Sequence, residues 1–325
     1  MTDPPARLKV AAAQYPIERL PDLAAVMAKH ARWVGQAAAG GARLVVFPEY
    51  AAMEIAGTLS DAVAADLQAS LEVVARLRPE VDANLASLAA RHDIHILGPS
   101  GPARRPDGSF ANTAHLMTPA GRVGIQEKII MTPFERRWGI TGGSALQVFE
   151  TALGRIGVLI CYDGEFPLLA RAMTDAAPVG MTPAGTTLPN KTMTDQGGGA
   201  RLILIPTCTE RISGFNRVRS AALARALEST VATVMSPTVG NAPWSPAVDR
   251  NCGAAGVFVP AEAGISDTGV LAEGCLDAAQ LVSAEIDFAH LEQLRTAGEM
   301  RNAADWRLQP GAEAARTTAV VVDLR

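Results

Sequence analysis

Short apolar runs alternate with segments of helical spacing along the chain, and this alternation constrains the fold more than any other feature. Residues 156–160 and 202–205 are continuous apolar runs of five and four residues, and residues 231–235 form a mostly apolar run of similar length. Runs of this length are typical of strands buried on both faces. Residues 22–39 are instead rich in alanine, with apolar side chains at helical spacing, and two glycines follow as a C-cap. The alternation predicts an α/β fold around a mixed sheet.

The same patterns assign the remaining elements and place them in one domain. Further strands are predicted at residues 8–14, 43–47, 94–97, 110–117, 122–130, 255–259 and 281–286. Further helices are predicted at residues 166–173, 218–229 and 61–91, the last as two helices broken near Pro79. A Pro/Gly turn at 118–121 predicts a hairpin. We predict a single domain over residues 1–325, with a core over about 7–310, a surface loop over about 176–199 and a C-terminal tail over about 307–325.

The size and charge of the chain limit the classes of function. Its 325 residues are 48% hydrophobic, which is enough for a large core. The net charge is −4 and no basic run is present, so nucleic acid is not an expected partner. No apolar stretch reaches the roughly 20 residues that span a bilayer, and the N-terminus lacks the pattern of a signal peptide. We therefore expect no membrane association.

The cysteines indicate a reducing compartment. Cys161, Cys208, Cys252 and Cys275 are far apart and form no C-x-x-C pair. In a chain of this length they do not suggest a disulfide framework. We predict a cytoplasmic location, where a reactive thiol survives best.

Cys161 lies where a nucleophile is well exposed. An apolar run leads directly into it, and a turn and a helix follow. A side chain at such a junction is held out of the sheet, and the next backbone N–H, that of Tyr162, can face a developing oxyanion. The start of the helix also favours a thiolate. The simpler interpretation is a small buried residue at a strand end, which is the commoner fate of a lone cysteine.

Three charged residues elsewhere in the chain favour the catalytic interpretation. Glu49 follows the apolar run 44–47, at the strand end where α/β sheets place their ligands. Partial burial would raise its pKa and make it a general base near neutral pH. Lys128 lies in an apolar segment, where an ammonium is costly to bury unless a carboxylate pairs with it. Glu135 follows on a segment opened by Pro133. Taken singly, each of the three is also compatible with an ordinary surface or loop charge.

Taken together, these segments resemble the nitrilase superfamily of carbon–nitrogen hydrolases. That family carries a glutamate in F-P-E, a lysine after a strand-like run and a cysteine in C-Y-D-x-x-F-P, which match Glu49, Lys128 and Cys161 in order. A second family glutamate, shortly after the lysine, matches Glu135. The resemblance covers about residues 9–306, and residues 240–246 resemble an amidase-like subgroup that is sometimes fused to an acetyltransferase. Two features depart from the family pattern: Leu168 replaces an acid after F-P, and the loop 176–199 is long.

The resemblance implies a fold, a reaction and a partner. The fold is a four-layer α-β-β-α sandwich, and family members usually pair, so at least a homodimer is expected. The substrate is a small-molecule amide, hydrolysed through a thioester on Cys161 with Glu49 as the general base. Lys128 and the Tyr162 backbone N–H would hold the oxyanion, and Glu135 would orient the substrate or Lys128. No cofactor and no metal are expected. The expected substrate-binding residues are Phe134, Trp138, Phe166, Thr207, Cys208 and Trp244, with Arg136, Arg137 or Arg211 as candidates for binding a carboxylate.

Several alternatives stay open at this stage. A nitrile or an N-carbamoyl compound suits the same site, and a non-catalytic scaffold member of the family would not use it. Cys208, also at a strand end, is a rival nucleophile, but it lacks a matching set of an acid and a lysine nearby in sequence. A cysteine–histidine protease or thioesterase would depend on one of the five histidines. His92 and His95 have no acid or cysteine cluster beside them, so we predict no zinc site.

Overall fold

The computed structural model describes residues 3–176, 198–312 and 318–325, and the loop predicted over 176–199 lies almost wholly outside these ranges. The helices are α1 (Leu23–Ala39), η1 (Ala51–Met53), α2 (Glu54–Gly57), α3 (Asp61–Ala65), α4 (Leu67–His92), α5 (Pro133–Trp138), η2 (Cys161–Glu165), α6 (Pro167–Thr174), α7 (Ile212–Ser229), α8 (Phe288–Ala297), α9 (Asn302–Asp305) and η3 (Trp306–Leu308). The strands are β1 (Arg7–Pro16), β2 (Leu44–Val46), β3 (His95–Leu97), β4 (Gly101–Arg104), β5 (Phe110–Met117), β6 (Val123–Glu127), β7 (Leu146–Thr151), β8 (Gly154–Val158), β9 (Leu202–Thr207), β10 (Ala232–Asn241), β11 (Arg250–Asn251), β12 (Gly256–Phe258), β13 (Val270–Glu273), β14 (Gln280–Asp287) and β15 (Ala319–Asp323).

These strands form one large, curled, mixed sheet with β1 and β10 at its centre. The order along the main path is β15-β7-β8-β9-β10-β1-β2-β3-β5-β4. Strands β8, β9 and β10 are parallel, and so are β1, β2 and β3, whereas β5 and β6 form the predicted antiparallel hairpin. β1 and β10 share only two residue pairs, Tyr15 with Thr238 and Pro16 with Val239. Because this junction is short, the sheet divides on either side of it into two halves.

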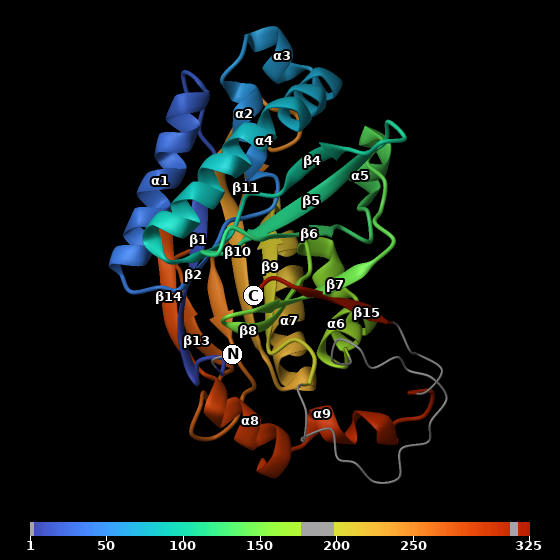
Figure 1. Cartoon of the computed structure of the whole chain (residues 1–325). Helices are drawn as coiled ribbons and strands as arrows, with labels where there is room; N and C mark the ends of the chain where they lie inside the picture. The colour runs from blue at the N-terminus through green and yellow to red at the C-terminus, as the bar shows by residue number, and fades with distance from the viewer. Residues whose placement is uncertain (1–2, 177–197, 313–317) are drawn as a thin grey trace.

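Helices cover the outer faces of both halves. α1 and α4 contact β2, β3, β4 and β5, and α6 and α7 contact β7 and β10 (Figure 1). Along β1, Val10 and Ala12 join a core with β8 and β9, whereas Ala11 and Ala13 join a second core with α1 and α4. Alternation between two apolar surroundings is the pattern of a strand buried on both faces. The layers follow the predicted order of helix, sheet, sheet and helix, with the two sheet layers joined at β1 and β10.

One helix boundary differs from the prediction. The segment 61–91 does hold two helices, but the break lies at Asp66, which caps α4 with its side chain, and Pro79 lies inside α4. A proline in a helix interior costs about 3 kcal/mol. Side chains on both sides of it, such as Val74 and Leu85, are fully buried, and each such burial contributes about 1.5–3 kcal/mol, so packing outweighs the proline. Neither α4 nor any other helix in the described ranges is both long and apolar enough to cross a membrane.

Two strands at one edge of the sheet are absent from the sequence prediction. β7 lies in a segment for which no element is predicted, and β15 lies in the segment predicted as a C-terminal tail. The two pair in parallel, from Ala319 opposite Leu146 to Asp323 opposite Glu150. The C-terminal segment therefore contributes the strand that ends the sheet on this side, and its pairing partner lies far away in the sequence.

Candidate active site

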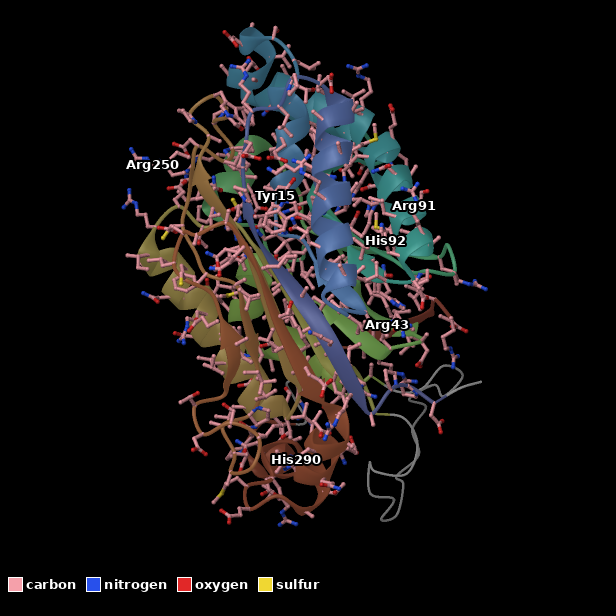
Figure 2. All side chains as sticks on the ribbon, turned by 90° about the vertical axis from the view of Figure 1, so that its left-hand side faces the viewer. Tyr15, Arg43, Arg91, His92, Arg250 and His290 are labelled. Atoms are coloured by element: carbon pink, nitrogen blue, oxygen red, sulfur yellow. The ribbon has the colours of Figure 1, made fainter. Side chains whose placement is uncertain are left out.

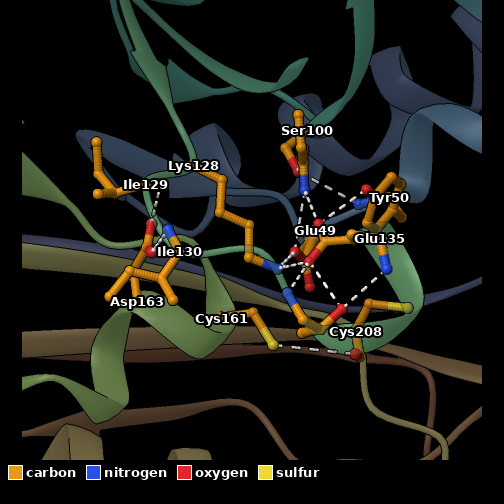
Figure 3. Close-up of polar contacts among 12 residues, drawn as sticks. Glu49, Tyr50, Ser100, Lys128, Ile129, Ile130, Glu135, Cys161, Asp163 and Cys208 are labelled. Atoms are coloured by element: carbon orange, nitrogen blue, oxygen red, sulfur yellow. Dashed lines mark hydrogen bonds and ion pairs between the residues drawn. The ribbon is translucent and has the colours of Figure 1, made fainter. Parts of the chain in front are cut away.

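Glu49 lies just past the end of a buried strand. The chain continues from β2 through Phe47, whose N–H donates to the carbonyl of Leu97 at 2.9 Å. After Pro48 comes Glu49, which is 2% exposed. Tyr50 then adopts the left-handed conformation, with φ 54°, and turns the chain into η1. This sharp turn ends the strand and leaves the Glu49 carboxylate among the polar groups drawn in Figure 3.

Lys128 joins two carboxylates that are far apart in the sequence. It follows β6, and its backbone N–H donates to the Asn112 carbonyl at 2.8 Å. Its Nζ lies 2.7 Å from Glu49 Oε1 and 2.7 Å from Glu135 Oε2, and its side chain is 1% exposed. A buried ammonium is tolerated when opposite charges satisfy its donors. The pairing predicted for Lys128 is therefore present, and it involves both predicted acids.

Glu135 is held by the helix that it caps. It lies in the first turn of α5, where its backbone N–H donates to Thr132 Oγ1 at 3.2 Å and its Oε2 accepts from the Thr132 N–H at 2.9 Å. This reciprocal pair is a capping box, and the order T-P-F-E in the sequence is its signature. Tyr50 donates its hydroxyl to Glu135 Oε1 at 2.9 Å. The same carboxylate thus begins a helix and binds Lys128.

Cys161 begins η2 in an unusual backbone conformation. Its φ is 49°, in the left-handed region, which costs about 1–2 kcal/mol for a residue other than glycine. The thiol lies 3.9 Å from the Cys208 carbonyl oxygen and close enough to Glu49 for that carboxylate to act on its ionisation. Figure 3 shows Cys161 beside Lys128 and Glu49. The N–H of Tyr162 belongs to the first turn of η2, where N–H groups lack partners within the helix.

Asp163 fixes the turn that carries Cys161 to the segment that carries Lys128. Its carboxylate accepts hydrogen bonds from the N–H groups of Ile129 at 3.0 Å and Ile130 at 2.8 Å (Figure 3). It is 1% exposed, and burial raises its pKa to about 6. The aspartate of the C-Y-D sequence therefore sets the distance between the thiol and the amine.

The cluster changes the ionisation of each of its members. Burial raises the pKa of Glu49 to about 7, with Lys128 opposing and Glu135 adding to the rise. Burial and the Glu49 carboxylate raise the pKa of the Cys161 thiol well above its ordinary value. Burial works against the charge of Lys128, but the two carboxylates outweigh it and raise the pKa. Burial likewise opposes ionisation of Glu135, yet Lys128 and the hydrogen bonds lower its pKa. At neutral pH, a neutral thiol therefore lies beside a base that can accept its proton and an ammonium that stays charged.

Three polar side chains complete the cluster but are not among the predicted site residues. Asn112 Nδ2 donates to Glu49 Oε1 at 3.0 Å and to Glu135 Oε1 at 3.3 Å. Ser100 Oγ donates to Asn112 Oδ1 at 2.9 Å, and Tyr50 binds Glu135 as described. Asn112 is fully buried in β5. A buried amide needs hydrogen-bond partners, so an asparagine inside an apolar strand is the signal that could have identified it.

A cavity of about 510 Å³ opens onto this cluster. Glu49, Lys128, Glu135 and Cys161 line it, together with Tyr162. Three of the six predicted substrate-binding residues also line it, namely Phe134, Trp138 and Cys208. Of the arginines proposed to bind a carboxylate, Arg211 lines the cavity and is joined there by Arg217 and Arg250.

The other three predicted substrate-binding residues lie elsewhere. Phe166 packs edge-on against Tyr162, with ring centroids 4.9 Å apart. Thr207 is 2% exposed and donates to the Ser236 carbonyl at 3.4 Å. Trp244 packs its ring against Gly57. None of the three is among the residues that line the cavity in the described part of the chain.

Comparison with known proteins supports the same assignment. The family model described as carbon-nitrogen hydrolase matches residues 9–179, which is more than half of the chain. The chain belongs to this family. The matched region of this carbon–nitrogen hydrolase contains all four residues of the cluster, Glu49, Lys128, Glu135 and Cys161. The same four residues line the cavity.

Individual relatives agree with the family assignment. This carbon–nitrogen hydrolase is 33% identical to the probable hydrolase YhcX of Bacillus subtilis (strain 168) over 221 residues, which are 68% of this chain and 39% of that protein. It is 31% identical to the bifunctional nitrilase/nitrile hydratase NIT4A of Lupinus angustifolius over 167 residues, which are 47% of this chain and 46% of that protein. The matches therefore span less than half of the length of either relative.

A solved structure shares the fold. The structure of an amidase from Nesterenkonia sp. superposes with a TM-score of 0.63 at 20% sequence identity, and the match covers 88% of this chain and 92% of that one. At this identity the likeness concerns the fold. The predicted α/β architecture is confirmed by it.

Proposed function

We propose that this chain hydrolyses a C–N bond of a small-molecule amide, with Cys161 as the nucleophile. The observation that supports this most is the contact of Lys128 with Glu49 and Glu135, with the thiol beside them in one cavity. Burying three charged groups is costly, and a scaffold would have no use for them. A neutral thiol next to a carboxylate that can accept its proton is what acyl transfer to sulfur requires.

The first half of the reaction forms a thioester. Glu49 accepts the thiol proton while the sulfur of Cys161 bonds to the carbonyl carbon of the amide. The carbonyl oxygen becomes an oxyanion, to which Lys128 Nζ and the Tyr162 backbone N–H donate hydrogen bonds. Because its pKa is about 7, Glu49 can then return the proton to the departing nitrogen as the C–N bond breaks. Ammonia or an amine leaves, and the acyl group stays on the sulfur.

The second half regenerates the enzyme. Glu49 takes a proton from a water molecule whose oxygen bonds to the thioester carbon, and the same donors hold the second oxyanion. Its collapse breaks the C–S bond, and the sulfur recovers the proton from Glu49 as the carboxylic acid leaves. In this scheme Glu135 touches no reacting atom. With Asn112, Glu135 holds the amine and the base at their distances from the thiol.

The test is ammonia release over a panel of amides, nitriles and N-carbamoyl compounds. The panel should include an ω-amide of a dicarboxylic acid, because Arg211 lines the cavity. We expect turnover of an amide by the wild type and by Cys275→Ala, which removes an exposed thiol, and none by Cys161→Ala. Full activity of Cys161→Ala would end the proposed mechanism.

Nitrile hydrolysis is the second candidate, because the lupin relative is named as a nitrilase and nitrile hydratase. The same thiolate would add to the nitrile carbon in place of the carbonyl carbon. Ammonia release from nitriles without release from amides would identify the chain as a nitrile hydrolase. Release from N-carbamoyl compounds alone would identify it as an N-carbamoyl hydrolase.

We also propose that two copies of the chain pair through α6 and α7. These outer helices expose Leu168, Ile212 and Leu227, at 38%, 48% and 41% of their surface. Outer helices that expose large apolar side chains are candidates for an interface, because burying this surface against a second copy is favourable. Light scattering should give the mass of a dimer for the wild type and a shift toward the monomer for Leu227→Glu. A monomeric wild type would exclude the pairing.

A further inference from the structure

A second cavity lies at the opposite end of β9 from the catalytic cluster. β9 ends at Thr207, and the next residue, Cys208, lines the catalytic cavity. The residue before β9, Arg201, lines another cavity, of about 230 Å³, formed with the start of the chain and α8. A strand of this length spans about 20 Å. Figure 1 shows α8 at the far end of the molecule from α5, the helix that carries Glu135.

Arg201 presents a poorly satisfied guanidinium to this cavity. Its plane stacks on Phe288 of α8, with the guanidinium carbon 3.5 Å from the ring centroid. One Nη donates to the Pro5 carbonyl at 2.9 Å, whereas Nε is buried without a hydrogen-bond partner. Burial lowers the pKa of Arg201 to about 10, so the side chain stays charged at neutral pH while losing hydration. A buried donor without an acceptor is unfavourable, because nothing replaces the hydrogen bond it made to water.

Arg295 brings a second guanidinium to the same cavity from α8. Burial lowers its pKa, and the charge of Arg171 adds to this effect. Among the described residues, no hydrogen bond or ion pair engages its guanidinium. Glu292, one turn earlier on α8, also lines the cavity and acts on both arginines through its charge. It forms no ion pair within 4.0 Å with either of them in the described part of the chain, so the two cations outnumber the one acid.

We propose that this cavity binds a small oxyanion, a phosphate or a carboxylate, between Arg201 and Arg295. Guanidinium groups match such anions through two parallel N–H donors, and stacking on an aromatic ring holds one of them in a fixed plane. An oxyanion would supply the acceptor that Arg201 Nε lacks and offset the excess positive charge. The cavity has room for an ion the size of phosphate or a short carboxylic acid. Because the site lies a strand length away from Cys161, the anion would not compete with the amide.

The experiment is calorimetric titration of the full-length chain with inorganic phosphate and, separately, with succinate, at low ionic strength. We expect a dissociation constant in the millimolar range for at least one of them, and the two titrations tell a phosphate site from a carboxylate site. Arg295→Gln should weaken binding at least about tenfold, which corresponds to about 1.4 kcal/mol. This variant is preferred to a change at Arg201, which also holds Pro5 and Phe288.

Two further variants test whether charge in the cavity controls the affinity for the anion. Glu292→Gln removes the only acid that lines the cavity in the described chain, so it should tighten anion binding several-fold. Arg91→Gln removes an exposed arginine on α4, far from His290 of α8 in Figure 2, and should leave binding unchanged. Amide turnover without added anion should be the same in Arg295→Gln and the wild type. Absence of binding, or equal affinity in the wild type and Arg295→Gln, would overturn the proposal.

Discussion

Lys128→Met tests most directly whether the buried cluster is held together by charge. Methionine keeps an unbranched apolar stem but removes the ammonium that lies 2.7 Å from both Glu49 and Glu135. Two carboxylates, each 2% exposed, would then lie close together without an opposite charge. Removing one partner of a buried ion pair costs about 3–5 kcal/mol. We expect the unfolding free energy to fall by this amount near neutral pH.

The loss of unfolding free energy in Lys128→Met should grow as the pH rises. In the wild type the pKa of Glu135 is lowered, so its ionisation stabilises the fold above the unfolded-state pKa, and this contribution is lost as the pH falls through the folded-state pKa. Without Lys128, burial and mutual repulsion raise the pKa of both acids, and at least one proton stays bound in the folded state. Each carboxyl group that is protonated in the folded variant but not in the folded wild type increases the difference between their unfolding free energies. The increase is about 1.4 kcal/mol per pH unit. For Glu135 the increase begins below the ordinary pKa of a glutamate, because its pKa in the folded wild type is lowered. For Glu49, whose pKa is about 7, it begins near neutrality.

The assay is urea unfolding of the wild type and Lys128→Met at about pH 5 and about pH 8, with the slope checked for two-state behaviour. Lys9→Met, at an exposed lysine, is the matched control and should change little at either pH. The double variant Lys128→Met/Glu135→Gln removes one of the two stranded carboxylates and should regain part of the stability at the higher pH. Equal destabilisation at both pH values would show that the acids do not depend on Lys128, and the charge argument would fail.

The remaining predictions concern catalysis and packing. kcat/KM should fall about tenfold per pH unit below about pH 7, because Glu49 must be ionised to accept the thiol proton. Glu135→Gln should move this acid limb to lower pH, since the charge of Glu135 raises the pKa of Glu49, and an unmoved limb in a pH–rate profile would contradict the coupling. Asn112→Leu should cost about 1–3 kcal/mol of stability in urea unfolding, because it removes one donor from each of two buried carboxylates and leaves the Ser100 hydroxyl without its acceptor. The added methyl group of Gly35→Ala in α1 meets no atom within 4 Å, so this variant should raise Tm through helix propensity. The methyl group of Gly142→Ala meets a backbone carbonyl, so this variant should lower Tm. A higher Tm for Gly142→Ala than for Gly35→Ala would contradict the packing.

Most of the fold could be predicted from local pattern, because buried strands and capped helices leave signals within a few residues. The runs at 156–160 and 202–205 became β8 and β9, and the hairpin at 110–130 became β5 and β6. β15 and β7 could not be predicted, since their pairing joins segments about as far apart as Leu146 and Ala319. The helix break predicted at Pro79 was wrong, because the sequence shows only the local loss of one helical hydrogen bond. The burial that keeps α4 continuous depends on the sheet beneath it.

The site divides in the same way between sequence and tertiary structure. Sequence alone determined which residue types end the strands, and hence the choice of Glu49, Lys128 and Cys161, because a buried strand that ends in an acid, an amine or a thiol is costly without a reason. Only the tertiary structure decided that Asn112 binds both acids. Only it decided which predicted pocket residues line the cavity. The register of the sheet sets the distances between these segments, and burial changes the pKa values of their side chains. Both effects exist only once the two halves of the sheet have packed together.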